Sequence, residues 1–173
     1  MRAATVVASA ALAAAVSLVG PGADAGGRWA PAATATIHPG TMMYTEGSQC
    51  TANFVYTDSA NRVYVGYAAH CAGTGSSTDT DGCSTKSLPL GTKVTFREGG
   101  NPADEGTKVG SGRLVYSSWL TMQRLHTRGA NTCAYNDLAL VRVAARDVSQ
   151  VNPSVPFWGG PTGIDTDGTA AGD

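Results

Sequence analysis

The segment CTANFVYTDSANRVYVGYAAHC, residues 50–71, decides the fold of this chain. Residues 50–56 and 62–67 are rich in β-branched and aromatic side chains, which favour strands. Residues 58–61 between them, Asp-Ser-Ala-Asn, are turn formers. This arrangement predicts a β-hairpin whose second strand runs directly into His70 and Cys71.

The rest of the chain also favours short strands over helices. Residues 72–84 are rich in Gly, Ser, Thr and Asp and predict a surface loop. Trp119 and Met122 begin a helical spacing that predicts a short helix over residues 119–128. Further strands are expected at residues 92–97, 108–117 and 137–143. Strands this short, with few helix-period stretches, predict an all-β barrel or sandwich and exclude a helical bundle.

The first 25 residues have the pattern of a secretory signal peptide. A positive start at Arg2 precedes an uncharged, Ala/Val-rich run, and Ala23-Asp24-Ala25 is an A-x-A cleavage signature. A membrane anchor is the alternative, but the apolar run is short and no basic stop-transfer flank follows it. We therefore expect secretion, with cleavage after Ala25 and no membrane association afterwards.

The remaining chain divides into three parts. Residues 26–40 are expected to form a loose N-terminal arm, with ordered structure beginning near Thr41. Residues 41–150 contain the predicted strands and form the folded domain. Residues 151–173 are rich in Pro and Gly and predict a connector.

Charge and cysteine content exclude several functions. The formal net charge is −1 and no basic run is present, so nucleic acid and anionic membrane surfaces are poor partners. The four cysteines are an even number, which fits disulfides in an oxidising compartment, and they allow three pairings. None of them forms a C-x-x-C pair, so a zinc site has little support.

Two segments carry residues suited to acid–base chemistry. The first ends in Ala68-Ala69-His70-Cys71, and the second is Asn136-Asp137-Leu138-Ala139-Leu140-Val141. Histidine is a general base near neutral pH, and a carboxylate on one ring nitrogen fixes its tautomer. Either residue alone is more often structural, and His38 and His126 are expected to be surface polar residues.

Together these two segments resemble the His and Asp motifs of chymotrypsin-like (trypsin-fold) serine proteases. That family commonly reads T-A-A-H-C and then D-I/L-A-L-L/V along the chain. Residues 47–54, GSQCTANF, also resemble a G-x-x-C-T-A-G-F strand of secreted bacterial members. The resemblance spans residues 47–143 and implies the first of two antiparallel β-barrels. It also implies a secreted endopeptidase that needs no cofactor and hydrolyses protein or peptide substrates through an acyl-enzyme.

The resemblance assigns roles to particular residues. His70 would be the general base and acid, and Asp137 its orienting carboxylate. In the family, the cysteine of the first strand bridges to the one beside the histidine. This implies a Cys50–Cys71 disulfide and leaves Cys83 to pair with Cys133.

The chain departs from the family at the nucleophile. No serine lies in a G-D-S-G-type turn, and the 36 residues after Asp137 are too few for a second barrel. We therefore expect this chain to be inactive alone, with residues 151–173 leading toward a missing barrel. The alternative is a secreted, disulfide-stapled pseudoprotease that binds rather than cuts. A weaker alternative is a metal site of His70, Cys71 and Asp137, which oxidised cysteines would remove.

Overall fold

The β-hairpin expected from residues 50–71 is present. The computed structural model describes residues 29–75, 79–101 and 103–160. Strand β3 (Val55–Thr57) pairs antiparallel with β4 (Val63–Tyr67). In the turn, the Asp58 carboxylate accepts hydrogen bonds from the backbone N–H groups of Ala60 and Arg62, at 3.0 and 2.9 Å. The predicted turn chemistry is therefore confirmed.

The strand predicted over residues 50–56 is broken into two. Strand β2 (Ser48–Thr51) pairs with β1 (Met42–Thr45), whereas β3 pairs with β4. Residues 52–54 make the change of partner. The Ala52 N–H donates to Thr41 O, beside β1, and the Asn53 N–H donates to Gly66 O in β4. One predicted strand thus serves two different parts of the sheet.

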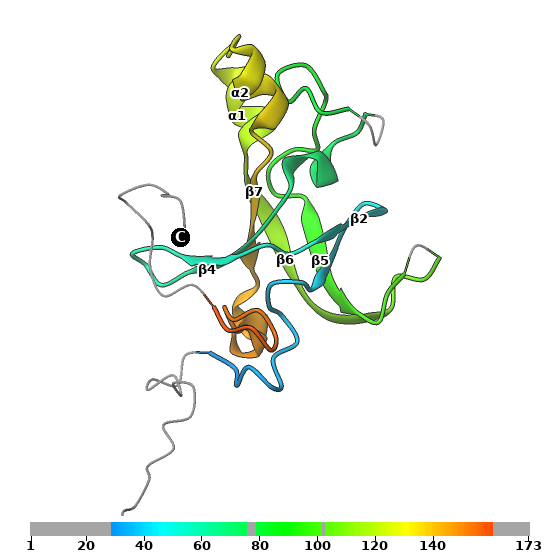
Figure 1. Cartoon of the computed structure of the whole chain (residues 1–173), viewed down its shortest axis with the longest axis vertical. Coiled ribbons are helices and arrows are strands. Elements are labelled where there is room, and N and C mark those ends of the chain that lie inside the picture. Colours follow the sequence, from blue (N-terminus) through cyan, green and yellow to red (C-terminus); the bar gives the residue numbers. More distant parts are fainter. Residues whose placement is uncertain (1–28, 76–78, 102, 161–173) are drawn as a thin grey trace, which may run out of the picture.

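Within the described residues, seven strands form a single antiparallel sheet in the order β2-β1-β5-β6-β7-β4-β3 (Figure 1). The strands not yet defined are β5 (Lys93–Glu98), β6 (Thr107–Ser117) and β7 (Ala139–Val143), close to the predicted ranges. The all-β prediction is confirmed at this level. The sheet is not closed, however, because its edge strands β2 and β3 do not pair with each other but follow one another in the chain.

Alternation of side chains along the strands builds the core. In β4, Val63, Val65 and Tyr67 are 2, 0 and 0% exposed, while Tyr64 between them is only half-buried. Successive strand residues point to opposite faces, so one face of the sheet supplies the apolar interior. The same interior contains the following buried residues: Met43, Val94, Phe96, Leu114, Trp119, Val141.

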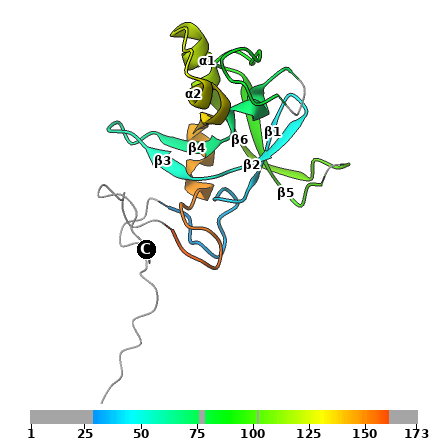
Figure 2. The ribbon, with the colours of Figure 1, turned by 45° about the horizontal axis from the view of Figure 1, so that its top comes forward.

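The helical segments η1, α1 and α2 gather at one end of the sheet (Figure 2). The 3-10 helix η1 (Ala69–Ala72) follows β4, α1 (Ser118–Arg124) follows β6, and α2 (Ala130–Tyr135) precedes β7. The predicted helix over residues 119–128 is therefore present but ends early. His126 adopts a left-handed φ of 52°, and Thr127 N–H donates to Met122 O, which closes the helix end.

The N-terminal segment is ordered earlier than predicted. Ile37 is fully buried and forms a parallel bridge with Val151. The Ala30 N–H donates to Val151 O, and the Asn152 side chain donates to Ala30 O. The segment packs beside the 3-10 helix η2 (Ala145–Gln150) and the chain that follows it (Figure 1). The expectation of a loose arm up to residue 40 is therefore wrong for the described part.

Two disulfides, Cys50–Cys71 and Cys83–Cys133, use all four cysteines. These are the pairings implied by the family resemblance. Disulfides of this kind are typical of extracellular proteins. In the part of the chain that the structure describes, no helix is long and apolar enough to cross a membrane. The predicted signal peptide, residues 1–25, lies outside the described residues, as do residues 161–173 of the predicted connector.

Candidate active site

His70 lies just beyond the end of β4, in the short helix η1. Its side chain is 48% exposed, whereas its neighbours Ala69 and Cys71 are buried. The disulfide from Cys71 reaches Cys50 on strand β2 and ties η1 to the sheet edge. The turn is also held locally, because Gly73 N–H donates to His70 O at 2.8 Å. The histidine is therefore solvent-facing on an anchored backbone.

Asp137 approaches His70 from the other side, just before β7 begins. Strands β4 and β7 are neighbours in the sheet, and Tyr67 pairs with Ala139 at their adjacent ends. The pairing brings residues 67 positions apart in the chain into contact. The structure thus brings together the two predicted catalytic residues.

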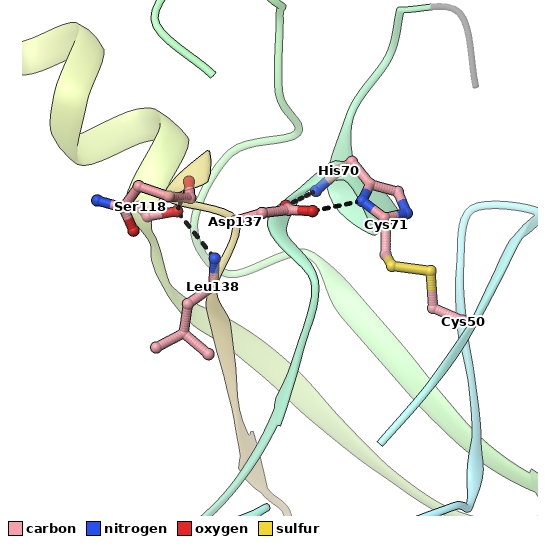
Figure 3. Close-up of polar contacts among 7 residues, drawn as sticks. Cys50, His70, Cys71, Ser118, Asp137 and Leu138 are labelled. Carbon is pink, nitrogen blue, oxygen red and sulfur yellow. Dashed lines mark hydrogen bonds and ion pairs between the residues drawn. A yellow bond between two sulfur atoms is a disulfide. The ribbon is translucent and has the colours of Figure 1, made fainter. Parts of the chain in front are cut away.

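The Asp137 carboxylate contacts His70 at two points (Figure 3). Its Oδ2 lies 2.6 Å from the imidazole Nδ1, and its Oδ1 accepts a hydrogen bond from the His70 backbone N–H at 2.8 Å. An ionised carboxylate can only accept, so the proton of the neutral imidazole belongs on Nδ1. The lone pair of the ring is then on Nε2, which is the nitrogen that a general base needs.

Ser118 holds the backbone on both sides of Asp137 (Figure 3). Its hydroxyl donates to Asn136 O at 2.8 Å and accepts from Leu138 N–H at 3.0 Å. Its backbone N–H also donates to Leu138 O at 2.8 Å. Ser118 is fully buried, so these hydrogen bonds are shielded from competing water. Ser118 was not predicted from the sequence, because nothing in the pattern of residues around it points to Asp137.

A shallow depression of about 270 Å³ borders the imidazole. Trp119 and Ser48 are among its lining residues, together with both members of the Cys50–Cys71 disulfide. Trp119 is only 1% exposed and belongs to the core cluster, so it is chiefly a packing residue. A small ligand group could reach His70 from this side.

No described serine hydrogen-bonds to the His70 ring. Ser111, Ser117 and Ser118 are buried in other contacts, and Ser48 lines the depression on edge strand β2. Ser76 and Ser77 lie outside the described residues. Among the residues that the structure describes, the histidine–carboxylate pair therefore has no serine hydrogen-bonded to its ring.

The other two histidines have different surroundings. The His38 ring nitrogen Nδ1 lies 2.7 Å from Pro39 O, next to it in the chain. His126 is exposed at the end of α1. Neither contacts a carboxylate, so the described structure gives only His70 the orienting partner of a general base.

The metal-site alternative fails on the chemistry of its donors. Cys71 lies near His70, and Asp81 lies near Cys83 and Cys133, but every one of these sulfurs is in a disulfide. A metal ligand must be a thiolate, which a disulfide sulfur is not. Cys71 therefore cannot bind a metal ion together with His70 and Asp137.

Comparisons of the chain with models of protein families, with curated proteins and with solved structures found no match.

Proposed function

We propose that this chain supplies the histidine–carboxylate half of a serine endopeptidase site of the chymotrypsin-like type. The observation that carries the proposal is the 2.6 Å contact from His70 Nδ1 to Asp137 Oδ2, with the ring 48% exposed. The seven-stranded antiparallel sheet and the Cys50–Cys71 disulfide support an assignment to the first of two β-barrels. The two disulfides also support a secreted protein.

In this proposal, Nε2 of His70 takes the proton from a serine hydroxyl as the oxygen attacks a peptide carbonyl. The imidazolium that forms is stabilised by the Asp137 carboxylate and then gives its proton to the leaving amine. Water attacks the resulting acyl-enzyme by the same route, with His70 again as the base. Asp137 stays ionised throughout and acts by orientation and charge.

The serine and the oxyanion hole would come from a second barrel. No serine of this sequence stands in a G-D-S-G context, so we expect no peptide cleavage by this chain alone. Even one missing oxyanion donor lowers the rate by roughly 10²–10³. A fluorophosphonate probe, which labels activated serines, is therefore expected to leave the purified chain unmodified. Stoichiometric labelling of any serine would contradict this.

Complementation tests the proposal directly. A separately expressed C-terminal barrel with a G-D-S-G turn is added to this chain, and cleavage of a fluorogenic peptide is followed. We expect activity that depends on both parts, disappears with His70→Ala and persists with His126→Ala, the matched histidine control. If the second barrel binds and activity survives His70→Ala, His70 is not the base. If no barrel binds or restores activity, the alternative of a binding module gains support.

A further inference from the structure

A basic groove lies at the end of β4 and β7 away from His70. It encloses about 700 Å³ and is bordered by the start of β4, the end of β7 and helix η2. Its cations come from five separate positions, and none of the described residues that line it is Asp or Glu. The cations of this basic groove are Arg62, Lys93, Arg113, Arg142, Arg146. Five of the 12 Lys and Arg residues of a chain with net charge −1 thus converge on one cavity.

Three of these cations form one row across adjacent strands. Lys93 of β5 pairs directly with Arg113 of β6, and Arg113 pairs directly with Arg142 of β7. All three side chains are exposed. Directly opposed residues in an antiparallel sheet lie about 5 Å apart at Cα, so the charges are close neighbours. Like charges in this position destabilise a sheet.

Neighbouring carboxylates pair with Arg62 and Arg146, the two cations of the groove that lie outside the row. Arg62 forms an ion pair with Asp58 at 2.6 Å, and Arg146 lies 3.6 Å from Asp147. Within residues 29–75, 79–101 and 103–160, the row of Lys93, Arg113 and Arg142 has no ion pair. The Arg113 guanidinium donates only to a backbone carbonyl, that of Gly91, at 2.8 Å. The groove therefore keeps a surplus of positive charge.

From this arrangement we infer that the basic groove binds a small oligoanion, a molecule with two or more oxyanion groups such as phosphates or carboxylates. Guanidinium groups bind such oxygens in bidentate fashion, and a lysine adds a point charge. A bound oligoanion would remove the mutual repulsion of the row. The inference does not depend on the proposed protease function.

The spacing favours a compact ligand over an acidic peptide strand. Long cationic side chains on Cα atoms about 5 Å apart can converge on oxyanion groups that are close together on one small molecule. In an extended peptide, side chains on the same face are about 6.6 Å apart, so successive acidic residues would not match the row. The cations also come from three strands, from Arg62 just before β4 and from η2 around a single cavity, not from a long linear track.

Titration calorimetry with tripolyphosphate, citrate and inorganic phosphate tests this inference on the purified chain. We expect saturable 1:1 binding of tripolyphosphate or citrate, and binding of inorganic phosphate at least about tenfold weaker, because one group cannot satisfy the row. Arg113→Gln and Arg142→Gln are each expected to lower the affinity for the tighter-binding oligoanion by about tenfold. The matched control is Lys108→Gln, which removes one exposed cation from the same strand as Arg113, outside the groove.

Thermal unfolding of the same variants separates ligand binding from folding. Without ligand, Arg142→Gln is expected to raise Tm relative to the unsubstituted chain, because it relieves repulsion in the row. With saturating tripolyphosphate, the unsubstituted chain is expected to gain more in Tm than the variant. Absence of saturable binding by both oligoanions would overturn the inference. So would an equal loss of affinity in Lys108→Gln, or tighter binding of an Asp-rich hexapeptide than of either oligoanion.

Discussion

The backbone N–H of His70 and the ring of the same residue both hydrogen-bond to the carboxylate of Asp137. Because Oδ1 is engaged by the backbone, the carboxylate cannot rotate freely about its own axis. Oδ2 is thereby kept opposite Nδ1. One side chain consequently sets both the position and the tautomer of the imidazole.

This double contact predicts the effect of Asp137→Asn. If the amide oxygen keeps the backbone N–H of His70, the amide NH₂ faces Nδ1 and forces that nitrogen to accept. The proton then belongs on Nε2, and the ring can no longer act as a base toward a hydroxyl. We expect ¹⁵N NMR at neutral pH to show Nδ1–H in the unsubstituted chain and Nε2–H in the variant.

The control for this experiment is Glu98→Gln, which makes the same carboxylate-to-amide change at an exposed site on β5. The His70 nitrogen shifts of that variant are expected to match those of the unsubstituted chain. An Asp137→Asn protein that folds normally and keeps Nδ1–H would contradict the orienting role of Asp137.

Ser118→Ala is predicted to loosen the Asp137 segment. The change leaves the Asn136 carbonyl and the Leu138 N–H without their side-chain partner, beside a fully buried position. Leaving a buried polar group unsatisfied costs about 1–3 kcal/mol. We expect a lower free energy of unfolding by that amount, and faster amide hydrogen exchange at Leu138. Chemical denaturation and exchange mass spectrometry measure the two effects.

Ser117→Ala is the matched control, because Ser117 is equally buried and adjacent but accepts only one weak hydrogen bond, from Leu120 N–H at 3.5 Å. Its loss is expected to destabilise helix α1 without changing exchange at Leu138. Equal exchange at Leu138 in both variants would mean that the Ser118 hydroxyl does not hold the segment.

Local sequence signals account for most of the strands but not for β1, which was not predicted, nor for all of the strand partners. The hairpin of β3 and β4 follows from its turn residues and β-branched flanks, which act within a few positions. Residues 50–56 also look like one strand, and the change of partner at Ala52 depends on β1 and β4 lying in opposite halves of the sheet. Local pattern contains no information about that arrangement, so the interruption was not predicted.

The same limit explains the elements that sequence reasoning missed. Helix α2 has only six residues, Asn and Thr among them, and so short a segment shows no helical periodicity. The Cys83–Cys133 disulfide ties this helix to the preceding loop. Ile37 is buried because Val151 pairs with it, 114 positions further along. The contact of His70 with Asp137 also joins residues far apart in the chain, 67 positions from each other. It was predicted only through the resemblance of the two motifs to those of a known family.

The two disulfides are predicted to contribute differently to stability and to the site. In the chain-entropy model, the 21-residue separation of Cys50 and Cys71 corresponds to about 3 kcal/mol, and the 50-residue separation of Cys83 and Cys133 to about 4 kcal/mol. Replacing each pair by alanine is expected to lower the free energy of unfolding by about these amounts. Urea denaturation of the two double variants provides the measurement.

Loss of Cys50–Cys71 is expected to change the surroundings of the His70 ring more than loss of Cys83–Cys133, although it costs less stability. Only Cys71 is adjacent to the histidine, so the Cys50→Ala, Cys71→Ala variant is expected to shift the His70 ¹⁵N signals, whereas loss of Cys83–Cys133 leaves them nearly unchanged. If both double variants move those signals equally, the neighbouring disulfide has no special part in placing the imidazole.

The stability that Asp58 gives to the β3–β4 hairpin is expected to depend on pH. Desolvation raises the pKa of Asp58, but hydrogen bonds from the Arg62 backbone, the Tyr64 hydroxyl and the Arg62 guanidinium outweigh it and lower the pKa from 3.8 to about 2.

A lowered folded-state pKa means that the carboxylate stabilises the fold fully above pH 3.8. That contribution is lost as the pH falls through about 2. Asp58→Asn keeps an oxygen for the backbone donors of the turn, but it removes the charge and replaces the oxygen that accepts from Arg62 Nε–H and the Tyr64 hydroxyl by an NH₂ group. The Tm difference between the unsubstituted chain and this variant is therefore expected to be constant above about pH 5 and to vanish near pH 2. Tyr64→Phe removes one donor to the carboxylate, at 2.8 Å, so its pH-dependent loss of stability is expected to be smaller and to be complete at a higher pH. A Tm difference that persists unchanged down to pH 2 would show that the charge of Asp58 does not stabilise the hairpin.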